Sequence, residues 1–515
     1  MNEQLDRGSI GLEVSNFGPI VEADVDLRPL TVLVGPSNTG KSYLAILIYA
    51  LHRYFGGGGG PARRRIPARF AMFRGPKDQE LPRKAIDSTV ELAERLLGDE
   101  ETRSSEAGII LPEWVVELIR SGLSKQGTYI GNEIGRCFGV KTIGALIRKE
   151  TKGKGAAVIG FRVHGENGQE PIDHRLTITP HASQLETIIA KATQMRIPIE
   201  DAAVRGRYLR NMALRMISAG DQGEEGLDFY ARELLQELAG YVHPQIVGPL
   251  HLPSFYLPAD RTGVMHAHNV VVSALIESAA MTGLRPAART PMLSGVLADF
   301  LEQLIDLDRS TFRRRQRRED LGKPIEEAIL AGSVEIDRSE AIDYPHFTYR
   351  PNGWRDNLPL MSASSMVSEL APVVLYLRHM VGPGNVLIVE EPESHLHPAM
   401  QVEFTRQLAH LVNAGIRVIV TTHSEWVLEE LANIVRRSEI SKTRRREAVG
   451  QRVALRPDQV GAWLFQQKRR PRGSVVKELK LDDETGLYPA DYDIVSEALY
   501  NDSASIFNET RIDIR

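Results

Sequence analysis

The chain has 515 residues, of which 42% are hydrophobic and 25% are charged, with a formal net charge of -4 and a pI near 6.4. This balance is typical of a folded protein with two or three cores, or with one core and a large insertion, and it excludes fibrous and mostly disordered classes. The slight acidic excess argues against nucleic-acid binding by the whole surface. The single cysteine, Cys137, excludes an internal disulfide and a cysteine-rich zinc site.

Neither a leader peptide nor a membrane anchor is visible in the sequence. The N-terminus lacks a basic start followed by an apolar stretch, and no apolar run approaches the ~20 residues needed to span a bilayer. The longest such run, residues 43–51, reads as an ordinary helix. We therefore expect a cytoplasmic protein without a membrane partner.

The first elements expected in chain order are three strands, and a loop with a phosphate-binding pattern follows them. Residues 10–14 and 21–27 alternate apolar with polar side chains, which predicts two strands joined by a turn, and the apolar run 30–34 predicts a buried strand. The next eight residues match G-x-x-x-x-G-K-[ST], a pattern with glycines around a phosphate, a lysine for the β and γ oxygens and a hydroxyl for Mg²⁺. The predicted ATP-binding residues are Gly35, Pro36, Ser37, Asn38, Thr39, Gly40, Lys41 and Ser42.

A long middle segment separates this loop from the remaining motifs. Five glycines at 56–60 predict a flexible exit from the first unit. Apolar spacing over residues 61–250 predicts a mainly helical, compact inserted domain with a strand-like interval at 158–163 and 176–179. No heptad run of several turns occurs, which argues against a long coiled coil.

The chain then returns to the predicted sheet. A strand is expected at 254–258, followed by helices at 269–281 and 293–307. Five arginines lie within the six residues Arg313 to Arg318. Such a run is either a solvated surface or a contact for nucleic acid, and the sequence leaves both open.

Acidic residues follow the apolar strand predicted at 386–389. A strand aimed at bound phosphates can deliver one acid to organise the water shell of Mg²⁺ and the next to activate the attacking water. We assign the metal role to Glu390, together with Ser42, and the role of catalytic base to Glu391. A charged turn is the alternative interpretation, and it would be preferred if the phosphate loop were absent.

Two further motifs accompany these acids. His423 ends the apolar strand predicted at 417–422, at the edge of the sheet where the phosphate loop is expected, so that it can reach the γ-phosphate; a structural histidine is the alternative. The hydroxyl-rich segment 362–369 begins a helix, where free N–H groups bind an anion or are simply capped. The candidates there are Ser364 and Ser365.

The order of these motifs resembles the ATP-binding cassette type of P-loop ATPase. The closer resemblance is to the RecF/OLD/SMC-like branch, whose members are often called AAA family ATPases. It covers roughly residues 8–55 and 254–435 and leaves the insertion uncovered. The segments that carry it are Asn16-Phe17-Gly18, Leu30-Thr31-Val32-Leu33-Val34-Gly35, Tyr256-Leu257-Pro258-Ala259-Asp260-Arg261, Glu390-Glu391-Pro392-Glu393-Ser394-His395-Leu396-His397-Pro398 and Thr421-Thr422-His423-Ser424.

The resemblance implies an α/β fold: an ATPase head with a mixed sheet and flanking helices, interrupted by the large insertion. Its parts are residues 1–60 and 251–435, with the insertion at 61–250 and a basic α/β extension at 436–515. It also implies a head-to-tail pair with ATP held between the phosphate loop of one chain and Ser364 and Ser365 of the other. Two features depart from the usual pattern: the signature lacks Gly-Gly and Gln, with Pro372 interrupting its helix, and Glu390 replaces the commoner aspartate.

Two residues in these motifs keep alternative interpretations. Phe17 either stacks near the adenine or packs in the core. Arg261 is either a phosphate or interface residue or a structural ion pair, and the ion pair is the preferred reading.

The C-terminal region is basic at 436–437, 442–446 and 468–472, and with Arg313 to Arg318 it forms a candidate track for DNA phosphates. Alternating segments at 461–466 and 474–481 predict a terminal hairpin, and residues 488–503 predict a capping helix. Asp491 and Asp493 have the spacing of a nuclease metal pair. They follow no buried strand, however, and too few residues remain for that domain, so an intrinsic nuclease is not expected.

The resemblance implies an ATPase, using ATP and Mg²⁺, that senses or regulates a separate effector, a nuclease or toxin, in anti-phage systems such as the Septu and PARIS types. One alternative is a DNA-repair clamp of the SMC/RecF kind. Another is a scaffold that binds ATP without hydrolysing it. A transporter subunit is the weakest reading, because the insertion is far larger than such subunits carry.

Overall fold

The structure is a computed structural model. It describes residues 10–56, 113–149, 155–164, 171–189, 224–267, 293–307, 320–337, 345–443, 453–482 and 497–507, with shorter stretches between them. Three features discussed in the sequence analysis lie outside these residues: the helix expected at 269–281, the arginine run 313–318, and the acidic pair at 491 and 493.

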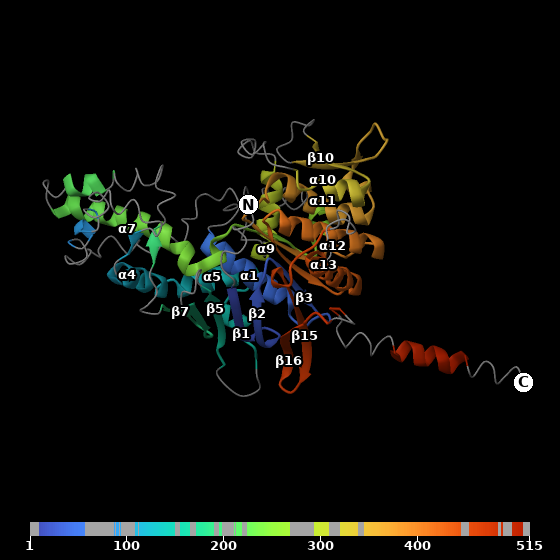
Figure 1. The fold of residues 1–515 in the computed structure, drawn as a ribbon, viewed down its shortest axis with the longest axis horizontal. Helices are drawn as coiled ribbons and strands as arrows, with labels where there is room; N and C mark the ends of the chain where they lie inside the picture. Colours follow the sequence, from blue (N-terminus) through green and yellow to red (C-terminus); the bar gives the residue numbers. More distant parts are fainter. Residues whose placement is uncertain are drawn as a thin grey trace, which may run out of the picture.

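An eleven-stranded mixed sheet forms the centre of the molecule, with helices on both faces (Figure 1). The strand order is β7-β6-β5-β1-β2-β16-β15-β3-β14-β13-β9. The strands are β1 (Ile10–Phe17), β2 (Ile20–Leu27), β3 (Leu30–Val34), β5 (Ala157–Val163), β6 (Ile172–Ile178), β7 (Ser183–Ile188), β9 (Ser254–Leu257), β13 (Val386–Glu390), β14 (Arg417–Thr422), β15 (Val460–Arg469) and β16 (Arg472–Glu478).

One half of the sheet is parallel, and it contains the strand that leads into the phosphate loop. Strand β3 pairs in parallel with β15 and β14, and β14, β13 and β9 continue in the same direction. Every residue of β3, β13 and β14 is buried, as expected for apolar strands covered on both faces. Because parallel strands end at one edge of a sheet, the segments after these strands meet at that edge.

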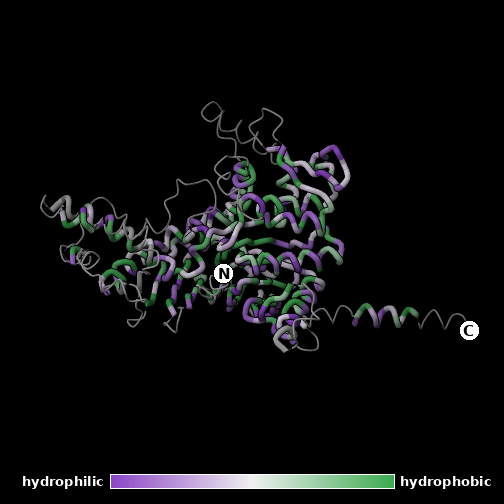
Figure 2. The backbone as a smooth tube through the Cα atoms, turned by 45° about the horizontal axis from the view of Figure 1, so that its top comes forward, coloured by the Kyte–Doolittle hydropathy of each residue, from purple (hydrophilic) through white to green (hydrophobic). Residues whose placement is uncertain are grey.

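The two faces of the parallel half are covered by different helices. Leu33 points into the core shared with α1 (Lys41–Gly56) and α5 (Gly127–Phe138), whereas Val32 and Val34 point into the core shared with α11 (Ser365–His379), α12 (Pro398–Asn413) and α13 (Glu425–Thr443). This alternation follows from the two-residue period of a strand. The central strands are hydrophobic along most of their length (Figure 2).

The middle segment contributes to the same sheet. Strands β5, β6 and β7 continue the sheet antiparallel from β1, and α4 (Glu113–Ser124) packs near β7. The strand-like interval expected within residues 61–250 is therefore part of the central sheet, because β5 pairs with β1 and β6 pairs with β5. The helical expectation holds for α4, α5 and α7 (Glu224–Val247).

The C-terminal hairpin also lies inside the sheet. Strands β15 and β16 are antiparallel to each other, as the alternating pattern predicts, and they occupy the place between β3 and β2. Residues 460–478 thus lie within the central sheet. The division of the chain at residues 60, 250 and 435 remains a proposal, and strands from all four of its parts belong to this sheet. Residues 497–507 form a helix that overlaps the one expected at 488–503, whose residues 488–496 lie outside the described part of the chain, and its Leu499 and Tyr500 are exposed.

Smaller elements complete the described residues. Helix α9 (Gly295–Asp306) packs beside α5 and β9, and a three-stranded sheet of β10 (Gly332–Asp337), β11 (His346–Pro351) and β12 (Leu358–Pro359) precedes α11. Strands β4 (Ile109–Ile110) and β8 (Arg196–Ile197) form a separate pair. Within the described part of the chain, no helix combines the length and the apolar character that crossing a bilayer requires.

Candidate ATP-binding site

The phosphate loop joins the end of β3 to the start of α1. Gly35 and Gly40 have φ values of +140° and +102°, a region that favours glycine. A Cβ atom at Gly35 would lie 2.6 Å from the carbonyl oxygen of Phe465, and one at Gly40 would lie 2.8 Å from Pro19. The loop is therefore held between β15 and the β1–β2 turn. Helix α1 begins at Lys41, so its first N–H groups are available for an anion.

Lys41 is buried beneath this loop. Its Nζ donates to the carbonyls of Gly35 at 2.9 Å and Pro36 at 3.0 Å, and it lies 3.0 Å from Nε2 of His423. Burial lowers the pKa of Lys41 to about 8, although the carboxylates of Glu391, Glu393 and Glu390 oppose that shift. The ammonium group thus rests on weak neutral acceptors, next to the acids that follow β13.

Glu391 and His423 converge on Lys41 from two neighbouring strands. Glu391 has a left-handed backbone with a φ of +42°, and its N–H is held by the carbonyl of Thr421 at 3.0 Å and by that residue's hydroxyl at 3.1 Å. Its Oε1 lies 3.4 Å from Nε2 of His423. His423 is also the first cause of a lowered pKa at Glu391, which keeps the carboxyl ionised. A single imidazole nitrogen therefore contacts both the lysine and the proposed base.

Glu390 lies deeper, beside the start of α1. It is 6% exposed, and Oε2 accepts the N–H of Ala259 at 3.2 Å. Burial raises the pKa of Glu390, and the Ser42 hydroxyl, the Ala259 N–H and the Tyr256 hydroxyl oppose that rise. Its Oε1 is buried without a hydrogen-bond partner.

These oxygens fit Mg²⁺. A carboxylate oxygen without a partner and a serine hydroxyl beside it are the hard donors that this ion prefers when it is also bound by phosphates. No cluster of three or more His, Cys, Asp or Glu side chains suited to a metal occurs among the described residues.

Glu393 supports the site in a way that the sequence did not reveal. The carboxylate of Glu393 accepts the hydroxyl of Thr422 at 2.7 Å and the backbone N–H of His423 at 2.6 Å, which fixes the histidine after its strand. Only its place as the third acid of the run that begins with Glu390 could have suggested this role.

Arg261 is fully buried and forms an ion pair with Glu369 of helix α11. It also donates to the carbonyl of Glu390 at 2.5 Å and to that of Glu391 at 3.3 Å. The preferred structural reading of Arg261 agrees with these contacts, which tie the acids after β13 to helix α11. Phe17 is likewise a core residue, packed edge-on against Tyr43 and Phe138.

The signature serines lie apart from the phosphate loop. Ser364 caps α11 by accepting the N–H of Val367 at 3.4 Å, and Ser364 and Ser365 are both exposed. In the described part of the chain no hydrogen bond joins either serine to residues 35–42. One expectation here is wrong: α11 continues through Pro372, because a proline removes only one backbone bond and the helix is buried along most of its length.

The structure therefore brings together Ser42, Lys41, Glu390, Glu391 and His423, and it leaves Ser364 and Ser365 elsewhere on the surface. A phosphate loop between a buried parallel strand and a helix, with acids from β13 and a histidine after β14, defines a P-loop nucleotide-binding site.

Comparison with known proteins gives one family match. Residues 273–429 match the AAA domain family described as "AAA domain, putative AbiEii toxin, Type IV TA system". The match includes Glu390, Glu391 and His423 and begins after the phosphate loop. None of the curated proteins compared with the chain matches it in sequence.

Solved structures of SMC heads are similar to the chain. One is the SMC head bound to the C-winged helix domain of ScpA, with 12% identity, a TM-score of 0.39 and coverage of 92% of this chain and 97% of that one. The SMC head of Thermotoga maritima has 13% identity, a TM-score of 0.34 and coverage of 92% and 99%. A head bound to the C-terminal domain of ScpA, from Pyrococcus furiosus, has 11% identity, a TM-score of 0.41 and coverage of 95% and 99%.

Proposed function

We propose that the chain is an ATPase that binds and hydrolyses ATP with Mg²⁺. The observation that carries this proposal is the convergence of Lys41, Glu391 and His423, with Nε2 of the histidine 3.0 Å from the lysine and 3.4 Å from the glutamate. These residues come from positions far apart in the chain. They meet at the edge of the sheet where β3 ends and the phosphate loop begins.

Each residue has a definite part in the proposed reaction. The loop N–H groups and Lys41 bind the phosphates, and the lysine exchanges the carbonyls of Gly35 and Pro36 for charged oxygens. Glu391 accepts a proton from the attacking water, which its ionised state allows. His423 orients Glu391 and contacts the γ-phosphate. Ser42 and Glu390 would hold Mg²⁺, which would supply positive charge against the phosphates.

Two copies are needed to complete the site in this proposal. Ser364 and Ser365 are exposed at the start of α11, where free N–H groups and hydroxyls suit a phosphate, yet they contact no part of their own phosphate loop in the described residues. A head-to-tail pair places them on the ATP of the partner. The buried triphosphate then holds the pair closed, and hydrolysis opens it.

The biological role that we propose is control of a separate effector, a nuclease or toxin, in cytoplasmic anti-phage defence. The family match supports this role because its description names a toxin of a toxin–antitoxin system. ATP-driven closing and opening of the pair provides the two states that restrain and release the effector.

The variant Glu391→Gln tests the ATPase. It removes the proton acceptor and keeps the size of the side chain, so we expect at least about a hundredfold slower phosphate release and a dimer that persists with ATP. Phosphate release and native mass with and without Mg²⁺ and ATP measure the two effects. Unchanged phosphate release would contradict the proposed hydrolysis. The remaining function would then be that of a scaffold that binds ATP without hydrolysing it.

Phage plating tests the biological role separately. Deleting the gene and its neighbour should raise plating for at least some phages, and unchanged plating across a broad panel would contradict the defence role without touching the ATPase.

A second candidate function, the DNA clamp, is favoured by one observation. Lys468, Arg469, Arg470 and Arg472 are exposed at the tip of the β15–β16 hairpin, which runs past the end of β3. Four cations at one tip suit a phosphate backbone. ATP-dependent retention on DNA that is lost when these four residues become glutamate would support the clamp, and retention without them would exclude the hairpin as its contact.

A further inference from the structure

Tyr256 is a buried tyrosine whose role the proposed ATPase reaction does not yet include. It lies on β9, the strand next to β13, and its side chain is 1% exposed. Its hydroxyl has no partner in hydrogen-bonding geometry, although it is fully enclosed. A buried hydroxyl without a partner is unfavourable, so such groups call for an explanation.

The surroundings of Tyr256 point to the metal-binding acid. Burial raises the pKa of the Tyr256 hydroxyl, and the nearby charge of Glu390 raises it further. Oε1 of Glu390 is also buried without a partner. The Tyr256 hydroxyl therefore lies close enough to the carboxylate of Glu390 to interact with it, although neither the hydroxyl nor Oε1 is in good hydrogen-bonding geometry, at the place where Ser42 and Glu390 fit Mg²⁺. Carboxylates that hold a metal are commonly held in turn by a hydrogen bond from a second residue.

The ring of Tyr256 also packs against the ring of Tyr49, which lies on helix α1. The two rings lie 5.2 Å apart at 54°, and both side chains are buried. The hydroxyl of Tyr49 donates to Oδ2 of Asp299 on α9 at 3.1 Å. Tyr49 is therefore held at both ends, by the ring of Tyr256 and by a carboxylate.

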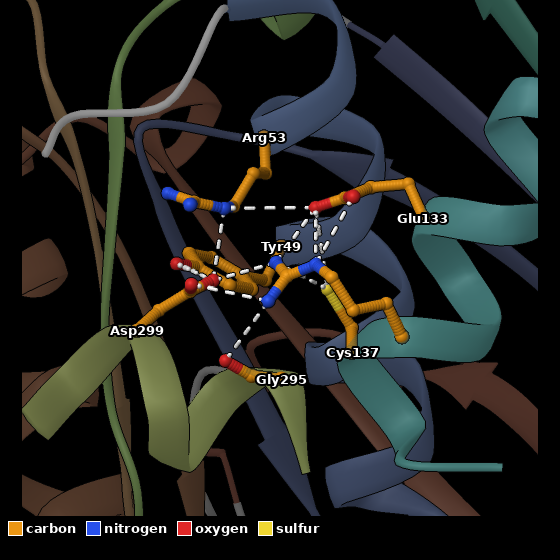
Figure 3. Close-up of polar contacts among 7 residues, drawn as sticks. Tyr49, Arg53, Glu133, Cys137, Gly295 and Asp299 are labelled. Atoms are coloured by element: carbon orange, nitrogen blue, oxygen red, sulfur yellow. Dashed lines mark hydrogen bonds and ion pairs between the residues drawn. The ribbon is translucent and has the colours of Figure 1, made fainter. Parts of the chain in front are cut away.

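Asp299 belongs to a charge cluster of four residues, Arg53, Glu133, Arg136 and Asp299 (Figure 3). Arg53 of α1 approaches Asp299 at 2.8 Å, and Arg136 of α5 donates to both of its oxygens at 2.7 and 3.1 Å. Glu133, one turn before Arg136, lies 2.7 Å from that arginine and 3.6 Å from Arg53. The cluster joins α1 and α9 of the head to α5 of the middle segment.

We propose that Tyr256 is a positioning residue that orients Glu390 for Mg²⁺, and that Tyr49, anchored on the charge cluster, holds Tyr256 in place. The inference rests on the proposed ATPase function. It adds a chain of contacts that joins the middle segment to Glu390. Helix α5 of the 61–250 segment contacts Asp299, Asp299 holds Tyr49, Tyr49 packs on Tyr256, and Tyr256 lies beside Glu390. The middle segment is thereby coupled to the metal-binding acid.

The variant Tyr256→Phe tests the first part of the proposal. It deletes one hydroxyl and keeps the ring that packs on Tyr49. We expect the Mg²⁺ concentration that half-saturates binding of a fluorescent ATP analogue to rise about tenfold or more. Binding of the same analogue in EDTA should be unchanged. Without Mg²⁺ the melting temperature should change little, because the hydroxyl lies beside Glu390 but outside good hydrogen-bonding geometry.

Tyr349→Phe is the matched control. Tyr349 is also buried, and its hydroxyl donates to the carbonyl of Leu330 at 2.7 Å in the small sheet, away from the phosphate loop. This variant should lower the melting temperature slightly and leave the Mg²⁺ requirement as it was. A hydroxyl with a merely structural role at Tyr256 would give this same pattern, and that result would overturn the proposal.

The pair Tyr49→Phe and Tyr49→Phe/Tyr256→Phe tests the path. If Tyr49 acts through Tyr256, the single variant raises the Mg²⁺ requirement, and the double variant requires no more Mg²⁺ than Tyr256→Phe alone. Full additivity would overturn the path. An unaltered chain whose nucleotide binding ignores Mg²⁺ would contradict the proposed function itself, whereas a normal Mg²⁺ response that Tyr256→Phe leaves unchanged would contradict only this inference.

Discussion

Lys41 has to exchange its partners when ATP binds, and this exchange can be measured. Its ammonium rests on the carbonyls of Gly35 and Pro36, and burial lowers its pKa to about 8. Bound phosphates add negative charge beside it, so the pKa has to rise on binding. A group whose pKa is raised in the complex contributes affinity that is complete below the pKa of the free state and is lost as the pH rises through that of the complex.

We therefore predict that ATP binding takes up close to one proton at about pH 9 and almost none through Lys41 at about pH 7. Calorimetry in two buffers with different heats of ionisation measures the uptake. Lys41→Arg is the control, because a guanidinium stays charged at both values and should show no uptake where it still binds. Equal heats in both buffers at the higher pH would mean that no proton is taken up. Lys41 would then already be protonated before ATP binds, which would contradict its lowered pKa.

At the residue scale, the sequence revealed those parts of the site that lie in short runs. The phosphate loop and the pair Glu390 and Glu391 are recognisable because their spacing along the chain is itself the chemical requirement. Arg261, Glu393 and Tyr256 were not assigned their contacts, because their partners come from other strands and from α11. A ring or a guanidinium in a short motif gives no sign of which distant group it contacts.

Helices α1, α5 and α9 are joined by the charge cluster, and removing one cation tests its strength. Arg53→Met should lower the free energy of unfolding by about 3 kcal/mol, because it leaves the carboxylates of Glu133 and Asp299 with a single arginine in a buried setting. Urea unfolding followed by circular dichroism measures the change.

The exposed pair of Arg120 and Glu117 on α4 supplies the control for this measurement. Arg120→Met should change the free energy of unfolding by less than about 1 kcal/mol, because water screens that pair. Equal effects of the two substitutions would show that the cluster does not hold the three helices together.

At the element scale, the sequence indicated most strands and helices but not which of them pair. Alternation predicted strands within 158–179 and the hairpin at 461–481, and the structure contains β5, β6, β15 and β16 there. Their periodicity could not show that β5 joins β1, or that β15 joins β3, because such pairs depend on residues more than a hundred positions apart. Short-range pattern predicts an element, whereas long-range packing decides its neighbours.

At the scale of the whole molecule, the head is assembled from both ends of the chain. The β15–β16 hairpin separates β2 from β3, which are adjacent in sequence, and thereby connects the antiparallel and parallel halves. It also lies against the nucleotide loop, since Phe465 packs on Gly35. The β15–β16 hairpin is consequently part of the sheet that carries the nucleotide loop, whatever further role its basic residues have.

Shortening the chain from its C-terminus tests this arrangement. A chain ending at residue 443 lacks both hairpin strands, so β2 and β3 lose their partners and buried residues such as Trp463 and Phe465 leave the core. We expect it to lose cooperative thermal unfolding, to bind a hydrophobic dye and to lose ATP binding.

A chain ending at residue 487 keeps the hairpin and loses the exposed helix 497–507, so its melting temperature should stay within about 2 °C of the full chain. Calorimetry and nucleotide binding on both chains check the two outcomes. Cooperative unfolding and ATP binding by the shorter chain would mean that the head forms without its central hairpin.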